Sequence, residues 1–271
     1  MSPSATEPEL LARAVRHLAP VLDLLTELGT RFRQAGHELA LVGGPVRDAF
    51  LGRTSPDLDF TTSAHPDEIE AVLHRWAEQT WDIGRAFGTI GARRGATTLE
   101  ITTYRADAYD AESRKPVVAF GDNLDDDLVR RDFTVNAMAL QLPELVFTDP
   151  HDGLADLAAG VLTTPHTPQV SFSDDPLRMM RAARFTSQLG LQVTDEVREA
   201  MTGMAQRLSI VSAERVRDEL SRLLIGADPR AGLELMVDTG LADVVLPELP
   251  ALRLEIDEHH RHKDVYQHSL T

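Results

Sequence analysis

Apolar side chains recur at intervals of three and four along the first thirty residues, which is the period of an amphipathic helix. Gly29 follows the last of them, and glycine is a common residue at helix ends. The pattern predicts one N-terminal helix over residues 1–30 that packs on the domain behind it. Its apolar positions are Leu10, Leu11, Ala14, Val15, Leu18, Leu22, Leu25 and Leu28.

Shorter apolar segments follow and predict strands that alternate with helices. "HELALVGG" is typical of a short strand, and "PVRDAFLG" of a short helix with Pro45 in its first turn. "PDLDFTTS" predicts a second strand, and "HPDEIEAVLHRWAEQT" a helix that begins at Pro66 with acidic first-turn residues. "TTLEITTY" alternates and predicts a third strand. Residues 105–127 are polar and rich in turn formers, so they predict a long loop.

From Asp174 onward the pattern becomes helical. Four segments each carry a helix start signal, and three of them end at a glycine: "DDPLRMMRAARFTSQLG", "TDEVREAMTGMAQRL", "SAERVRDELSRLLIG" and "DPRAGLELMVDTG". The predicted fold class is therefore α+β: a head with a mixed or antiparallel sheet, and an all-helical neck. The expected domains are the helix over 1–30, the head over 31–158, the neck over 159–255 and a final segment over 256–271.

Composition limits the functions that this chain can perform. No apolar run is long enough for a membrane span, and the N-terminus has no signal-peptide core. The absence of cysteine excludes disulfides and thiolate metal sites and fits a cytoplasmic protein. A net charge of −16 argues against broad tracking of a phosphate backbone, so contact with nucleic acid would depend on local arginines or on metal ions. Nothing in the sequence indicates a protein partner or a membrane partner.

The segment "LVGGPVRDAFLGRTSPDLDF", residues 41–60, joins two chemical features. Glycines at a strand-to-helix turn let backbone N–H groups approach a phosphate. Arg47, one turn into the helix, could place its forked guanidinium on phosphate oxygens. Taken alone, the Gly-Gly pair favours the alternative, a tight turn with an arginine–aspartate pair on the surface.

Asp57 and Asp59 are two residues apart in a predicted strand, so both carboxylates point to one face of the sheet. Such a pair can hold two Mg²⁺ ions for in-line displacement at phosphorus. Glu100, on the alternating strand "TTLEITTY", could supply a third carboxylate. The alternative is a solvated strand end. The Gly-Gly-x-x-Arg-Asp segment upstream favours the metal site, because a phosphate cradle and the carboxylates then share one edge.

Five motifs in order carry a family resemblance: the segment above, "RRDFTVNAMAL", "DPHDGLADL", "DDPLRMMRAARF" and "VSAERVRDELSRLL". From about residue 39 to residue 224 the chain resembles the class II CCA-adding tRNA nucleotidyltransferases, which belong with bacterial poly(A) polymerases to the polymerase β-like superfamily. The resemblance implies template-independent addition of C, C and A to tRNA 3′ ends. CTP and ATP would be the substrates, Mg²⁺ the cofactor and tRNA the partner.

The resemblance also implies roles for residues of the head. Gly44 and Arg47 would touch the incoming nucleotide, and Asp57 and Asp59 would bind Mg²⁺. Ribose selection would fall to the Arg-Arg-Asp-Phe-Thr motif, and a hinge between head and neck to the "DPHDGLADL" motif. The residues concerned in these last two motifs are Arg131 and Asp132 for the sugar, and Asp149, Gly153 and Asp156 for the hinge.

In the neck, the resemblance implies an amino-acid template that reads the base. The template stands here as Asp174, Asp175 and Arg178, with Asp174 where the family usually has Glu. We expect Asp174 to lie one helical turn before Arg178 and to orient its guanidinium. Arg181 and Arg184 continue the spacing and are expected to face the triphosphate or the primer. The fifth motif, with Glu214 and Arg215, is interpreted as a structural brace between neck helices.

Other functions stay open at this stage. A poly(A) polymerase is the nearest rival, although Ala86 stands where such enzymes tend to carry a second basic residue. A CC-only enzyme is another, but the loop before "RRDFT" looks complete. Residues 256–271 resemble the start of an HD-type module, so an HD-type phosphohydrolase with a nucleotide-binding head is a candidate from a different class. A non-catalytic RNA-binding module would not need paired carboxylates, which repel phosphates unless metal is bound.

Overall fold

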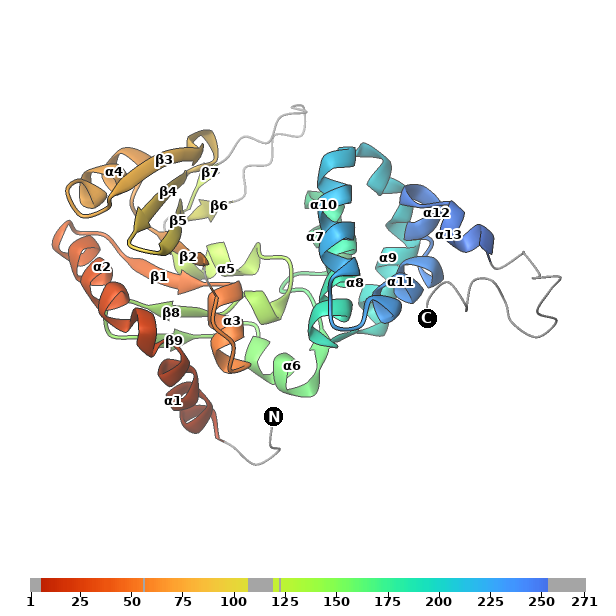
Figure 1. The fold of residues 1–271 in the computed structure, drawn as a ribbon, viewed down its shortest axis with the longest axis horizontal. Helices are drawn as coiled ribbons and strands as arrows, with labels where there is room; N and C mark the ends of the chain where they lie inside the picture. The colour runs from red at the N-terminus through yellow and green to blue at the C-terminus, as the bar shows by residue number, and fades with distance from the viewer. Residues whose placement is uncertain (1–5, 56, 107–118, 122, 253–271) are drawn as a thin grey trace. The chain divides into compact units, whose positions relative to one another are not determined.

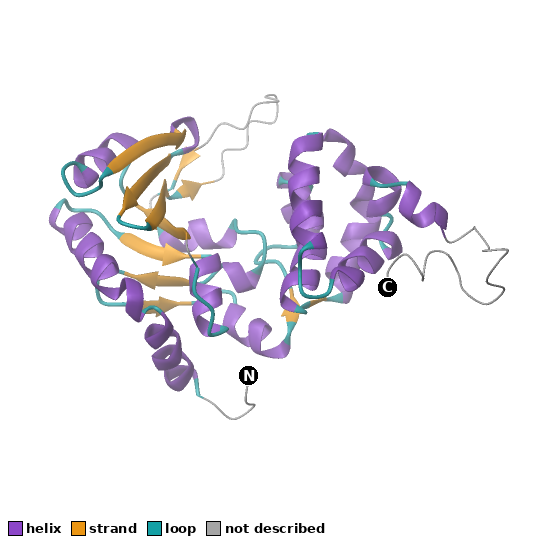
Figure 2. Cartoon of the chain, viewed as in Figure 1, coloured by secondary structure: helices purple, strands orange, loops and turns teal. Residues whose placement is uncertain are grey.

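The computed structural model describes residues 6–252 except 56, 107–118 and 122. The chain divides into two compact units, residues 1–158 and residues 159–271 (Figure 1). The first unit holds a large sheet with helices, and the second is almost entirely helical (Figure 2). The predicted α+β class, a sheet-containing head followed by a helical neck, is confirmed. The expected start of an HD-type module, at residues 256–271, lies outside the described residues.

The sheet of the first unit has seven strands in the order β3-β4-β5-β2-β1-β8-β9. Every neighbouring pair is antiparallel except β2 and β5, which run parallel, so the sheet is mixed. A separate short pair joins β6 (Arg105–Ala106) to β7 (Ala119–Phe120) within the region predicted as a long loop. The main strands are β1 (Leu39–Val42), β2 (Asp57–Thr62), β3 (Gln79–Gly84), β4 (Thr89–Arg94), β5 (Thr97–Thr103), β8 (Ala139–Gln141) and β9 (Val146–Thr148).

The N-terminal segment forms two helices, so the prediction of a single helix that ends at Gly29 was wrong. A 3-10 turn, η1 (Ala19–Val21), contains Pro20, which lacks a backbone N–H and interrupts the ladder. The second helix continues past Gly29 to Gln34. Gly29 does not end the helix; it is the residue at which the helix touches the loop after β8. The helices of this unit are α1 (Glu7–His17), α2 (Leu22–Gln34), α3 (Gly44–Phe50), α4 (Pro66–Leu73), η2 (Arg85–Phe87), α5 (Leu124–Val129), η3 (Thr134–Asn136) and α6 (Gly153–Ala159).

Helix α4 is shorter than its pattern predicted. It ends at Leu73, and the residues predicted as its last turn lead into strand β3. The chain turns at Arg75, whose φ of +59° is incompatible with a continuing helix. Strands β3 and β4 were not predicted. In β3, apolar Trp81 and Ile83 alternate with Thr80 and Asp82, but the first two residues of the strand were assigned to the preceding helix and the short alternation was not recognised.

Different elements cover the two faces of the sheet. Helix α4 packs on β4 and β5 on the face that buries Leu58 and Phe60 of β2. The opposite face is covered over β1 and β8, where α5 buries an apolar cluster. The members of this cluster are Ala40, Val42, Tyr104, Leu124, Leu128, Ala137 and Ala139. Over β5, β4 and β3 the same face presents the exposed side chains that form the sites described below.

The second unit is built around helix α8, which packs against α10 and α11. Close approach depends on small residues: a Cβ at Gly232 would lie 2.8 Å from the Ala183 carbonyl oxygen. Its elements are β10 (Val161–Leu162), α7 (Pro168–Asp174), α8 (Leu177–Leu189), β11 (Gln192–Val193), α9 (Asp195–Met204), η4 (Ala205–Ile210), α10 (Ala213–Leu224), α11 (Pro229–Asp238), α12 (Leu241–Val245) and α13 (Glu248–Ala251). Within the described ranges, every helix is too short or too polar to span a membrane.

Replacing Gly29 with alanine tests the contact between α2 and the loop after β8. An added Cβ would lie 2.5 Å from the Leu142 Cβ and 2.9 Å from the Pro143 nitrogen, so backbone must move. We expect Gly29→Ala to lower the free energy of unfolding by about 1–3 kcal/mol, as overpacking does elsewhere. Gly203→Ala in α9 is the control, since nothing lies within 4 Å of its added Cβ; it should be neutral or stabilise by up to about 1 kcal/mol. Urea denaturation followed by circular dichroism gives both values, and equal effects would contradict the contact.

Candidate active site

Three carboxylates, those of Asp57, Asp59 and Glu100, lie together on one face of the sheet, and we call them the carboxylate row. Helix α5 covers another part of the same face, over β1 and β8. Strand β2 buries Leu58 and Phe60 on one face and therefore presents Asp57 and Asp59 on the other. Its parallel neighbour β5 pairs Glu100 with Asp59 and Thr98 with Asp57. Paired residues on adjacent strands share a face, so Glu100 lies beside Asp59, about 4.8 Å away at the backbone. Asp57 and Glu100 are exposed and Asp59 is half-buried.

The donor set of this row fits Mg²⁺. In the part of the chain that the structure describes, no three His, Cys, Asp or Glu side chains converge closely enough to hold a metal ion by themselves. Mg²⁺ does not require such a cage, because it keeps several waters and is usually held by one or two carboxylates together with substrate phosphates. Asp57 and Asp59 provide two hard oxygen donors on one face, and Glu100 a third beside them.

The Gly43–Gly44 turn lies next to this row. Strand β1 ends at Val42, one residue after Leu41, which pairs with Phe60 of β2. Gly43 has φ +71° and caps α3, a conformation that favours glycine. A Cβ there would also approach the Arg131 Nη1 to 3.0 Å. The turn, the carboxylate row and Arg131 therefore share one region of the first unit.

Arg47 is part of a buried polar network. Its Nη1 donates to the Asn136 Oδ1 at 2.6 Å, and the Asn136 Nδ2 donates to the Asp132 Oδ1 at 2.9 Å. Its Nε and Nη2 both donate to the Asp48 Oδ1, at 2.9 and 2.7 Å. The fork that was expected to bind phosphate is thus engaged by Asp48. Arg47 is only 8% exposed, which indicates that it holds α3 to the Asp132–Asn136 segment.

Arg131 and Asp132 point to different partners. The Arg131 Nη2 donates to the Asp127 Oδ2 at 3.0 Å, across one turn of the segment that starts with α5. Asp132 is buried and also accepts from the Phe133 backbone N–H at 2.9 Å. Asn136, Asp48 and Asp127 were not among the residues predicted from the sequence. Asn136 lies in the quoted "RRDFTVN" motif, four residues after Asp132, and that spacing was the available signal.

The segment predicted as a hinge forms the start of helix α6. Asp149 caps this helix: its two carboxylate oxygens accept from the Gly153 and Leu154 backbone N–H groups at 2.8 and 2.9 Å. A Cβ on Gly153 would lie 2.1 Å from the Thr134 carbonyl oxygen, so only glycine fits. Asp156 accepts from the Thr134 hydroxyl at 2.6 Å. These contacts tie α6 to the 134–138 segment of the first unit.

The template residues of the neck lie at a break between two helices. Helix α7 ends at Asp174 and α8 begins at Leu177, so the expectation that Asp174 precedes Arg178 by one turn of a single helix was wrong. Pro176 between them cannot continue the ladder of α7. The Asp175 Oδ1 accepts from the Leu177 N–H at 3.1 Å, and its Oδ2 pairs with the Arg215 Nη2 at 2.7 Å. The Arg178 Nη1 donates to the Ser171 Oγ at 2.8 Å.

Arg184 lies inside the neck and does not face outward as predicted. Its Nε is 2.6 Å from the Glu219 Oε2 of α10, and both side chains are about a tenth exposed or less. Its guanidinium also lies 4.3 Å from the centre of the Phe185 ring. Arg181 is half-buried, with its Nη1 4.0 Å from the Glu219 Oε1. Spacing along the sequence could not predict which of these arginines is buried. Burial depends on the side chain of α10 that faces each of Arg178, Arg181 and Arg184.

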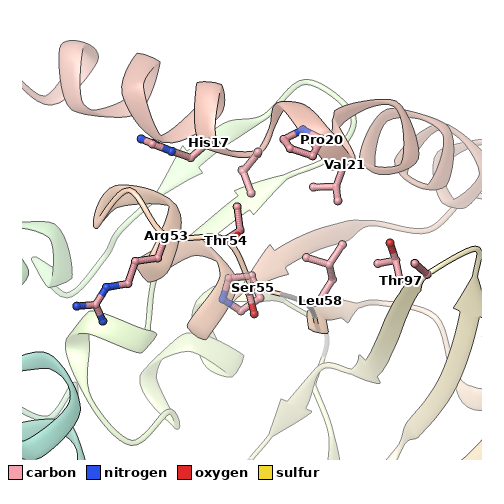
Figure 3. A pocket seen from close by; sticks show the side chains of 11 residues that line it. His17, Pro20, Val21, Arg53, Thr54, Ser55, Leu58 and Thr97 are labelled. Carbon is pink, nitrogen blue, oxygen red and sulfur yellow. The ribbon is translucent and has the colours of Figure 1, made fainter. Parts of the chain in front are cut away.

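A pocket of about 280 Å³ lies on the other side of β2 (Figure 3). Leu58 lines it, and strand alternation puts Leu58 on the face opposite to Asp57 and Asp59. Figure 3 shows the Arg53 side chain directed away from it. None of the predicted site residues lines this pocket. The candidate site is therefore the open carboxylate row, and this pocket is a separate feature.

Two protein-family models match the chain. The first, described as "Poly A polymerase head domain", matches residues 39–163. The second, described as "Probable RNA and SrmB- binding site of polymerase A", matches residues 190–252. The first covers the head residues of the candidate site, and the second covers the neck from the end of α8 onward.

Curated proteins with similar sequences carry the name CCA-adding enzyme. The protein of Leuconostoc mesenteroides is 38% identical over 227 residues, which is 83% of this chain and 54% of that protein. That of Levilactobacillus brevis is 40% identical over 228 residues, 84% of this chain and 56% of that protein. The chain therefore spans about half the length of the curated relatives that it matches.

Solved structures with the same fold carry related names. The Bacillus stearothermophilus CCA-adding enzyme in complex with CTP matches with a TM-score of 0.74 and 33% identity, over 82% of this chain and 53% of that one. The Thermotoga maritima CCA-adding enzyme complexed with tRNA matches with a TM-score of 0.70 and 26% identity, over 89% of this chain and 55% of that one.

Removing the carboxylate of Glu219 tests the structural role of Arg184. Glu219→Ala removes the carboxylate that faces the buried Arg184 guanidinium, so we expect the free energy of unfolding to fall by about 3–5 kcal/mol. Asp218→Ala on the same helix is the control, because the Arg217–Asp218 pair is 71% and 59% exposed and should contribute at most about 1 kcal/mol. Thermal denaturation of both variants compares the two pairs. A small effect of Glu219→Ala would show that Arg184 is not held in this way.

Proposed function

We propose that this chain carries the catalytic head and neck of an enzyme that adds C, C and A to tRNA 3′ ends. The chain belongs to the family of CCA-adding tRNA nucleotidyltransferases and bacterial poly(A) polymerases. The observation that supports the proposal most strongly is the register of β2 and β5, which sets Asp59 beside Glu100 with Asp57 on the same face. CTP and ATP are the proposed nucleotide substrates. We place the reaction in the cytoplasm, in keeping with a chain that has no cysteine.

The proposed reaction is a displacement at phosphorus. The terminal hydroxyl of the tRNA attacks the α-phosphorus of the nucleotide, the bond from that phosphorus to the bridging oxygen breaks, and pyrophosphate leaves with the electron pair. Asp57 and Asp59 are the proposed Mg²⁺ ligands. Bound Mg²⁺ would lower the pKa of the attacking hydroxyl and neutralise charge on the pyrophosphate. Glu100, next to Asp59, adds negative charge that attracts the cation to this face.

The nucleotide is proposed to bind over the Gly43–Gly44 turn. Gly44 has no side chain to obstruct the approach, and Arg131 lies against Gly43 with its side chain 24% exposed. Asp132 and Asn136 are the proposed support for the sugar side of the site, through the network that includes Arg47. In this proposal Arg47 acts by fixing the turn, while Gly44, Arg131 and Asp132 provide the groups nearest to the bound nucleotide.

Asp175 and Arg178 are the proposed base-reading pair. A carboxylate accepts from the exocyclic amine that both C and A carry, and a guanidinium donates to ring nitrogen and carbonyl. Arg215 holds one oxygen of Asp175 and the Leu177 N–H holds the other, so the carboxylate has a fixed orientation. Arg181, half-buried beside Glu219, could steer phosphate from the same helix, whereas Arg184 serves the fold.

Primer extension tests the metal-binding role of the carboxylate row. The substrates are a tRNA that ends before CCA, CTP, ATP and Mg²⁺, and the variants are Asp59→Asn and Asp57→Asn. We expect addition of C, C and A that then stops, and a loss of at least about 100-fold with either variant, since each removes a charge that holds the ion. Asp82→Asn, on β3 of the same sheet, is the control and should keep activity.

The products separate the alternatives. A growing poly(A) ladder would replace the proposal by a poly(A) polymerase, and addition of C alone by a CC-adding enzyme. Incorporation that is equally strong in Asp59→Asn would contradict the role of the carboxylate row.

Arg215 provides a second test, directed at base selection. Arg215→Ala frees one oxygen of Asp175, so the carboxylate can rotate and the preference for C and A over U and G should fall by about 5- to 100-fold. Arg217→Ala on the same exposed helix is the matched control, because Arg217 pairs only with its neighbour Asp218 among the described residues. Competition between CTP and UTP in single-nucleotide addition measures the preference. Unchanged selectivity in Arg215→Ala would show that this contact is only a structural brace.

A further inference from the structure

An exposed apolar surface lies on the same face of the sheet as the carboxylate row, at the β3 edge. We name it the β3 platform and define it by Trp81, Ile83 and Phe87, which are 37%, 46% and 51% exposed. Large apolar side chains gathered on an open surface commonly mark an interaction site. Nothing in the catalytic proposal above uses these residues.

The register of the strands fixes the side of the sheet on which the platform lies. Trp81 pairs with Gly91 of β4, Gly91 pairs with Glu100 of β5, and Glu100 pairs with Asp59 of β2. Residues paired in this way share a face. Trp81 is therefore on the same face as the carboxylates, and its strand is three strand spacings from that of Asp59.

Gly91 lets the indole lie down on the sheet. A Cβ at Gly91 would be 2.5 Å from the Cε2 and Nε1 of Trp81 and 2.8 Å from the Ile83 Cδ1, so both side chains cover the bare backbone of β4. Phe87 joins them on this face, since it packs against Gly84, which pairs with Thr89 after the irregularity at Asp82. The indole over β4 is then about 10 Å from Asp59, or two strand spacings.

A cation accompanies the aromatic surface. Arg93 lies two residues after Gly91 on β4, on the same face, and is exposed. It forms no ion pair with any described residue, whereas its neighbour Arg94 is bound on the other face by Glu27 and the Trp76 carbonyl. Arg105 also reaches this face, where its Nη2 donates to the Thr89 hydroxyl at 3.4 Å. Aromatic side chains interleaved with arginines are the usual composition of a single-strand nucleic-acid surface.

We infer that the β3 platform binds the single-stranded 3′ end of the RNA primer by stacking a base on Trp81, with Arg93 at a backbone phosphate. This inference rests on the proposed function, because the reacting hydroxyl must reach the Asp57–Asp59 row. The distance of about 10 Å fits a base within about three nucleotides of the reacting end, given about 3.4 Å or more per nucleotide. Stacking tolerates any base, which suits a surface that must hold an end whose sequence changes with each addition.

Tryptophan fluorescence tests the platform directly. The chain has two tryptophans, and Trp76 is buried under Arg94, so quenching by a ligand reports on Trp81. The probe is an RNA acceptor-stem hairpin with a single-stranded 3′ end, titrated into the full 271-residue chain without nucleotide. We expect the RNA to quench the emission. Trp81→Ala should weaken binding by about 5- to 100-fold, measured by fluorescence anisotropy of labelled RNA, while Trp81→Phe should keep most of the affinity.

Two controls accompany this measurement. Val146→Ala changes an exposed apolar residue of β9 at the opposite edge of the same sheet and should leave RNA affinity unchanged. Arg93→Gln should reduce the slope of log affinity against log salt by about 0.7, the value for one lost contact to a single strand.

Several results would overturn the inference. No quenching up to millimolar RNA, or equal affinity of the wild type and Trp81→Ala, would show that the primer does not stack there. Self-association in sedimentation that Trp81→Ala abolishes and RNA leaves unchanged would assign the platform to a second copy of the chain. Because binding is measured without nucleotide, this result is independent of nucleotide incorporation, and either proposal can fail alone.

Discussion

Parallel pairing between β2 and β5 is the constraint on which the rest of the head depends. A shift of one residue in either strand would turn its buried apolar side chains toward solvent. The burial of Leu58 and Phe60 therefore fixes the face of the sheet on which Asp57 and Asp59 lie. The same register sets Glu100 beside Asp59. Like charges this close repel, and the cost is met by the apolar packing on the other face. The apolar core thus helps to hold the three carboxylates close together on the other face.

The glycine turn and the arginines around it follow from that position. Strand β1 is the other neighbour of β2, so the turn after Val42 begins beside Asp59. Arg47 then brings the segment after α5 to the same place through Asn136, because a buried guanidinium needs its hydrogen bonds satisfied. The site is made from three separate stretches of chain, and each is held by contacts to the others as well as by its own secondary structure.

The sequence predicted the fold class, and the errors in the predicted elements and in the position of Arg184 have a common cause. Residues 57–62 and 97–103 alternate because one face is buried, so they were identified as strands. β3 has no buried side chain, and its short alternation of Trp81 and Ile83 with polar residues was not recognised as a strand. In the neck, helical spacing placed Arg184 with Arg178 and Arg181, but Glu219, more than thirty residues later in the chain, decides that Arg184 is buried. The pattern of apolar residues predicts which face of an element is buried. The burial of Arg184 depends instead on a partner that is distant in the sequence.

The acidic character of the chain is consistent with an RNA substrate if placement matters more than total charge. At a net charge of −16 the chain repels a polyanion at long range, and many arginines are already paired with carboxylates, among them Arg85, Arg131 and Arg215. Stacking on Trp81 involves no charge and so is not weakened by that repulsion. The carboxylate row opposes phosphate until a cation is bound. RNA affinity at this face should therefore rise with Mg²⁺ and nucleotide, which couples the two substrates through charge neutralisation without any movement of the sheet.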